Sequence, residues 1–109
     1  LADMIPQRNN LDPRRVVDVV ATVFGISPEK LMSKSRTHEV ALPRQVAMYL
    51  MRQEAKVSLP QIGEALGGRD HTTVIYACEK VAEMIQRDDT LRKQVNQIRE
   101  ALLSRAAVH

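Results

Sequence analysis

Aromatic side chains and cysteine are scarce in this sequence of 109 residues. Phe24, Tyr49 and Tyr76 are its only Phe, Tyr or Trp residues, so the core must consist of Val, Ile, Leu, Met and Ala. The single cysteine, Cys78, excludes an intrachain disulfide and fits a reducing cytoplasm. Because it falls within an apolar helical stripe, we interpret it as a small core residue and not as a nucleophile.

Long hydrophobic runs are also missing. No apolar stretch reaches the roughly 20 residues needed to span a membrane, and no signal peptide is recognisable at the N-terminus. We therefore expect a cytoplasmic protein. Because residue 1 is Leu and not Met, we expect the sequence to be a piece of a longer chain. Hydrophobic residues make up 44% of it, which is enough for one domain with a modest core.

Positive charge is concentrated in one third of the sequence. The formal net charge is +3, but residues 30–69 hold seven Lys or Arg against three acids, whereas the rest holds nine against ten. A contiguous basic segment suits a polyanionic partner. Ordinary surface charge explains the same numbers, so charge alone leaves both interpretations open.

Proline, glycine and capping residues divide the chain into helices. Asp12–Pro13 predicts a helix start, valines at helical spacing follow, and Gly25 ends the helix. Ser27–Pro28 begins a short helix to about Met32. No strand pattern or repeat is found, so we expect an all-α fold of five to six helices. The further helices are expected over residues 43–56, opened by Pro43, over 60–66, over 71–87, and from about residue 91, with a loop at 33–42.

The helices at 60–66 and 71–87 predict a helix-turn-helix. One is short and one is long, and a turn containing Gly67 and Gly68 joins them. In such motifs the second helix enters the major groove of DNA with its N-terminal end first. That end carries the polar run Asp70, His71, Thr72 and Thr73.

These polar residues have chemistry suited to base edges. Asp70 at the N-cap could simply accept backbone N–H bonds, or it could also accept from a cytosine N4 group. The hydroxyl and methyl groups of Thr72 and Thr73 match polar base atoms and the thymine methyl. Arg69 could reach a phosphate, and Tyr76, on the same face, could contact the DNA backbone.

The basic segment offers further contacts. Arg36, in the expected loop, is either a plain surface charge or an arginine that enters a narrow A/T-rich minor groove. Arg44 and Gln45 would fall in the first turn after Pro43, where free N–H groups could bind a phosphate. The alternative for that turn is simple solvation.

Catalytic patterns are not recognisable. Asp70, His71 and Thr72 are residue types of a catalytic triad, but adjacent residues point in different directions. No histidine is paired with Cys or acids at metal-ligand spacing. The run GGRDHT lacks the Gly-Lys-Thr core of a phosphate-binding loop. We therefore expect no enzyme activity, no metal and no cofactor within this sequence.

The run GGRDHTTV at 67–74 resembles the signature of the DnaA family of bacterial replication initiators, in its C-terminal domain. LMSKSR, PRQVAMYL and SLPQIGEALGGRDHTTVIYACEK follow the family's order over roughly residues 11–88. The resemblance implies a helix-turn-helix domain at 11–109 that binds DnaA boxes, nonamers related to TTATCCACA, in double-stranded DNA at the replication origin. Residues 1–10 would end the preceding ATPase module, which binds ATP, and its connector.

The resemblance also implies roles for individual residues. Asp70, His71, Thr72 and Thr73 would face the major groove, and Arg36 would enter the minor groove. Family positions that hold or neighbour the DNA backbone match Lys34, Arg44, Gln45, Arg52, Leu59, Pro60 and Arg69. Tyr76 departs from the family, since it replaces a histidine seen in some relatives, and it is kept with Ala77 as a further candidate for a backbone contact. The loop departs from the family at Ser35, His38, Glu39 and Leu42, where many members carry more arginine. Fewer cations would release fewer counterions.

Other functions and partners stay open at this point. A promoter-binding repressor or sigma-type module would use the same groove mechanism at a different site. A protein-interaction bundle would need an exposed apolar patch. The half-apolar helix at 13–24 could pack against the ATPase module or lie on acidic phospholipid, and the full-length protein is expected to oligomerise through other domains.

Overall fold

The computed structural model describes residues 12–108, with side chains up to Leu103, and all the regular secondary structure in this part of the chain is helical. The all-α prediction is confirmed. The predicted end of a preceding module at residues 1–10 lies outside the described residues. The helices are α1 (Pro13–Phe24), α2 (Pro28–Leu31), α3 (His38–Glu54), α4 (Leu59–Ala65), α5 (His71–Arg87) and α6 (Asp89–Val108).

The helices mostly begin where the sequence predicts. Asp12 accepts from the Arg14 N–H at 3.0 Å, with Pro13 as the first helical residue of α1. Ser58 and Gln61 form a reciprocal capping box at the start of α4. The glycine that ends α1, Gly25, has a φ of 72° as predicted for a left-handed cap.

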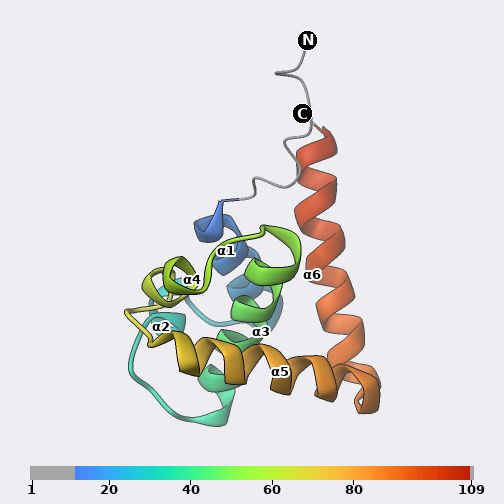
Figure 1. Ribbon diagram of the computed structural model, residues 1–109. Coiled ribbons are helices and arrows are strands. Elements are labelled where there is room, and N and C mark those ends of the chain that lie inside the picture. Colours follow the sequence, from blue (N-terminus) through green and yellow to red (C-terminus); the bar gives the residue numbers. More distant parts are fainter. Residues whose placement is uncertain (1–11, 109) are drawn as a thin grey trace.

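Helix α3 is the centre of the packing. It lies against α5 on one side and α1 on the other, and α6 runs up along α1 and α3 (Figure 1). Cys78 is part of the core, with an exposure of 6%. The core is aliphatic as expected, and its largest fully buried side chains are Leu31, Met48, Leu50, Met51, Ile62, Leu66, Leu91, Ile98 and Leu102.

The predicted start of α3 was wrong. The helix begins at His38 after the N-cap Thr37, and Pro43 lies inside it. Proline cannot donate to the carbonyl four residues earlier, but Val40 and Pro43 are both buried. Burial of this extra turn offsets one lost hydrogen bond. The loop between α2 and α3 is therefore shorter than predicted and is centred on residues 33–37.

The apolar stripe of α1 is not exposed to an outside partner. Val16, Val17, Val20 and Ala21 are buried in the domain's own core. The idea that this stripe packs against an ATPase module or lies on phospholipid is therefore not supported. No helix between residues 12 and 108 is both long enough and apolar enough to cross a membrane.

Candidate nucleic-acid interface

Helices α4 and α5 form the predicted helix-turn-helix. The turn closes on one acceptor, the Gly63 carbonyl, which receives the N–H groups of Gly68 at 2.9 Å and Arg69 at 2.8 Å. Gly67 has a φ of 90°, and a Cβ on it would collide with the Met32 carbonyl. Only glycine satisfies both conditions, so the turn rests directly on the end of α2.

The first turn of α5 presents its polar residues to solvent. Asp70, His71, Thr72 and Thr73 are all exposed. Their orientation follows from the opposite face of the helix, which is anchored in the core by the buried residues Val74, Ala77, Cys78 and Val81. The run predicted for base contacts is therefore free along its whole length.

Asp70 occupies the N-cap position, but its side chain makes no capping hydrogen bond. The expectation that its carboxylate accepts backbone N–H bonds was therefore wrong in detail. The carboxylate is 65% exposed and lies 3.9 Å from Nδ1 of His71. Because its oxygens are not bound to the helix N-terminus, they are available to an outside donor.

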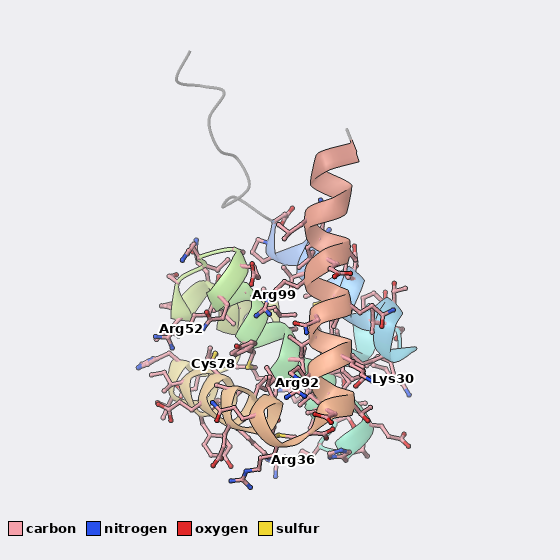
Figure 2. The ribbon with its side chains drawn as sticks, turned by 90° about the vertical axis from the view of Figure 1, so that its right-hand side faces the viewer. Lys30, Arg36, Arg52, Cys78, Arg92 and Arg99 are labelled. Atoms are coloured by element: carbon pink, nitrogen blue, oxygen red, sulfur yellow. The ribbon has the colours of Figure 1, made fainter. Side chains whose placement is uncertain are left out.

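The loop at 33–37 holds Arg36 at the surface. Its backbone is ordered by serines, since the Ser35 N–H donates to Oγ of Ser33 at 3.2 Å and the Thr37 N–H donates to Oγ of Ser35 at 3.4 Å. Arg36 is exposed, and in the described part of the chain its side chain has neither a hydrogen bond nor an ion pair. Figure 2 shows it at the outer edge of the molecule.

Arg44 is a structural anchor for this loop. It is 8% exposed, and it donates to the carbonyls of Leu31 at 2.8 Å, Ser35 at 2.9 Å and Ser33 at 2.8 Å. Burial lowers the pKa of Arg44, and the nearby charge of Arg69 lowers it further. The predicted phosphate site in a first turn at Arg44 and Gln45 was wrong, because both residues lie well inside α3.

A groove of about 380 Å³ brings many of the predicted residues together. It lies between the loop, α3 and α5, and its lining contains no acid. The predicted residues that line it are Lys34, Arg36, Arg44, Gln45, Arg69, Thr73, Tyr76 and Ala77. The lining does not include Asp70, His71 and Thr72 at the start of α5, which lie in the sequence between the lining residues Arg69 and Thr73, nor Arg52 on α3 and Leu59 and Pro60 on α4.

Two features of this surface were missed from the sequence. The Ser33 carbonyl accepts from Arg69 as well as Arg44, a contact between residues 36 positions apart that leaves no local pattern. Lys80 places its Nζ 5.9 Å from the centre of the Tyr76 ring. The spacing of four residues could have indicated that pair.

Metal chemistry has no support in the described residues, since no three His, Cys, Asp or Glu side chains among them gather at a possible metal site.

Comparison with known proteins identifies the family. The model of the family described as "Bacterial dnaA protein helix-turn-helix" matches residues 13–81. The chromosomal replication initiator protein DnaA of Chloroflexus aurantiacus is 46% identical over 104 residues, which is 94% of this chain and 22% of that protein. The DnaA of Thermus thermophilus is 46% identical over 96 residues, again 22% of its length.

A solved structure has the same fold. The crystal structure of a DNA replication initiation factor superposes with a TM-score of 0.77 at 27% sequence identity, covering 91% of this chain and 30% of that one. The chain thus spans about a fifth of the length of its DnaA relatives. Since the family model covers more than half of the chain, from the start of α1 through α4, the turn and α5 as far as Val81, the chain belongs to the bacterial DnaA helix-turn-helix family.

Proposed function

We propose that this domain binds double-stranded DNA sequence-specifically at DnaA boxes, nonamers related to TTATCCACA, during initiation of chromosome replication. The observation that carries the proposal is the acid-free cationic groove beside the exposed polar turn of α5. Phosphates would occupy the groove, and base edges would meet the turn. The domain of this family is a DNA-binding unit and not a catalytic one.

The first turn of α5 would enter the major groove. Thr72 and Thr73 offer hydroxyl and methyl groups to base edges, and the free carboxylate of Asp70 suits the N4 amino group of cytosine. His71, which is 63% exposed beside Asp70, can donate or accept through its ring nitrogens. The positive end of the α5 dipole favours approach to the phosphate-lined groove.

The loop would contact the minor groove at the A/T-rich end of the box through Arg36. A narrow A/T minor groove has an enhanced negative potential, and an exposed, unpaired guanidinium suits it. Backbone contacts are proposed for the cations and polar groups on either side, namely Lys34, Gln45, Arg52, Arg69 and Tyr76, with Leu59, Pro60 and Ala77 packed beside the sugar-phosphate chain.

Our inferences about the rest of the protein rest only on membership of the family. We infer that residues 11–109 form the box-binding domain and that an ATPase module precedes it and binds ATP. We also infer that the full-length protein oligomerises through other domains and acts in the cytoplasm. A contact with acidic phospholipid would have to use residues other than the buried stripe of α1.

Alternative functions predict different surfaces or different sites. A protein-interaction bundle needs an apolar patch, but the exposed large hydrophobic residues in the described part of the chain are Met32, Tyr76 and Leu103, on separate elements. A promoter-binding module would share the groove mechanism. Selection of bound sequences from a random DNA pool distinguishes it, because DnaA-box nonamers should be recovered only by an origin binder.

The direct test is a titration of the chain with a labelled duplex that contains one box, beside a duplex of the same composition in scrambled order. We expect the box to bind about a thousandfold more tightly or better at equal salt. Equal affinities for the two duplexes would contradict sequence-specific binding. Absence of binding to either would contradict DNA binding altogether.

A further inference from the structure

One carbonyl oxygen joins the loop to the helix-turn-helix. The Ser33 carbonyl accepts a hydrogen bond from Nη2 of Arg44 at 2.8 Å and another from Nη2 of Arg69. Arg44 belongs to α3, and Arg69 immediately precedes the N-cap of α5. The three groups, called the Ser33 clamp below, therefore connect the loop, the central helix and the start of the proposed recognition helix.

Further hydrogen bonds of the guanidinium hold Arg44 in this position. Nε donates to the Leu31 carbonyl at 2.8 Å, Nη1 to Ser35 at 2.9 Å, and Nη2 also reaches Lys30 at 3.4 Å. A guanidinium that is 8% exposed would be costly without partners, and the carbonyl dipoles offset that cost. Most of its donors thus hold the chain between Lys30 and Ser35, immediately before Arg36, and have little capacity left for a phosphate.

The turn before α5 is fitted to the same place. Gly67 packs against the Met32 carbonyl so closely that no side chain could be inserted, and Ser33 is the next residue. The loop that carries Arg36 and the turn that carries Asp70 are therefore in contact at two successive carbonyls, Met32 and Ser33.

We propose that Arg44 and Arg69 are positioning residues, and that the Ser33 clamp sets the separation between Arg36 and the first turn of α5. With the clamp intact, the minor-groove contact and the major-groove contact fit one DNA site together. With the clamp loosened, Arg36 is still present but no longer held for the A/T-rich end of the box. The DNA part of this inference rests on the proposed function, but the clamp itself can be tested without DNA.

The variant Arg44→Lys separates geometry from charge. Lysine keeps the positive charge but has a single side-chain nitrogen. It therefore cannot reproduce the hydrogen bonds that the planar guanidinium donates to four different carbonyls. Arg87→Lys is the matched control, since Arg87 makes an exposed pair with Glu83 at the far end of α5. Arg69→Lys removes only the hydrogen bond from Arg69 to the Ser33 carbonyl, and it is the variant to measure if Arg44→Lys does not fold.

Without DNA, hydrogen exchange measures the loop directly. In Arg44→Lys we expect the Ser35 and Thr37 amides to exchange about tenfold faster or more. Amides of α6 should be unchanged, and Arg87→Lys should match the wild type throughout. Unchanged exchange at Ser35 and Thr37 in both Arg44→Lys and Arg69→Lys would overturn the clamp, whatever the domain binds.

With DNA, the readout is discrimination at the A/T-rich end of the box. The wild type should lose affinity when those pairs are changed to G/C, and Arg44→Lys should lose most of that sensitivity although Arg36 and the net charge are retained. Adding Arg36→Ala to Arg44→Lys should then have little further effect on the ratio. The slope of log affinity against log salt should be the same in Arg44→Lys and the wild type.

The outcomes separate this inference from the proposed function. If Arg44→Lys weakens binding to both duplexes equally, Arg44 is a phosphate contact and the positioning role is wrong. If wild-type protein binds the box and a scrambled duplex equally, the proposed function is wrong, and loop exchange alone then decides whether the Ser33 clamp exists.

Discussion

Two regions of the molecule differ in whether their arginines and lysines form ion pairs with carboxylates of the chain. Around α6 three arginines are paired within the chain, since Arg99 donates to Glu54 at 2.6 Å and Arg87 to Glu83 at 2.8 Å, while Arg92 pairs with Asp89. Around the loop and the turn before α5, no ion pair with a carboxylate is found among the described residues for Lys34, Arg36, Arg44 or Arg69. Figure 2 shows Arg92 and Arg99 along α6 and Arg36 apart from them.

The contrast indicates which charges no carboxylate neutralises and an outside anion could therefore approach, although the donors of Arg44 itself are already used by carbonyls of the loop. The exposed pair of Arg87 and Glu83 contributes little to stability, because solvent screens it. In the groove, Arg44 and Arg69 lie close enough that the charge of Arg69 lowers the pKa of Arg44. Such repulsion is unfavourable in the free protein and would be relieved by phosphates.

The largest expected difference between the two regions is in affinity for the box after one threonine in each region is replaced. Thr73→Val preserves shape but removes the hydroxyl, so box binding should weaken by about 1–3 kcal/mol with little change in non-specific binding. Thr90→Val, at the exposed start of α6, should leave both affinities unchanged. Titration of each variant with box and scrambled duplexes measures this. Equal losses for the two variants would remove the distinction between the regions.

The second expected effect is on salt dependence. Arg36→Ala removes an unpaired cation, so the slope of log affinity against log salt should flatten by about one unit or less. Arg87→Ala removes a cation that is already paired, and its slope should match the wild type. The thermal midpoint should hardly change for Arg36→Ala, because the residue is exposed in a loop. A flatter slope for Arg87→Ala would contradict the account.

The smallest expected effect is on the buried side of α5. Burial raises the pKa of the Cys78 thiol, although Arg52 beside it acts in the opposite direction. The folded state therefore keeps the thiol proton where the unfolded chain has lost it. This contribution to stability is complete below the unfolded pKa of about 8.5 and is lost as pH rises through the higher folded value.

Thermal unfolding from neutral to alkaline pH measures that contribution. The midpoint of the wild type should fall more steeply above about pH 8.5 than that of Cys78→Ala, which has no thiol to titrate. Binding of the box at neutral pH should be unaffected by the thiol, since Cys78 faces the core. Parallel curves for the two proteins would show that Cys78 makes no such contribution.

Local signals in the sequence predicted most of the fold. The caps Asp12 and Ser27 bond as expected, and the helix-turn-helix at 60–66 and 71–87 agrees with α4 and α5 to within a residue. These signals act over one helical turn, so they are visible in the sequence. The exposed polar run that opens α5 could be predicted for the same reason.

The features that could not be predicted depend on distant residues. The sequence pattern predicts that a helix begins at Pro43, but burial of Val40 extends α3 back to His38. Arg44 resembled a phosphate ligand, whereas its bonds to carbonyls of the loop require the tertiary fold. Asp70 has the position of a cap without the side-chain bond, and only the side-chain geometry shows that.

The most direct test of the central claim is a map of the backbone amides that shift in an NMR titration with the box duplex. The account predicts that the shifts gather at residues 33–37 and 69–77 and spare the α6 residues from Leu91 to Leu102. A scrambled duplex at the same salt should produce weaker shifts at 70–73. Shifts concentrated on α6, or an identical pattern with both duplexes, would contradict the claim that the groove and the first turn of α5 form the specific DNA surface.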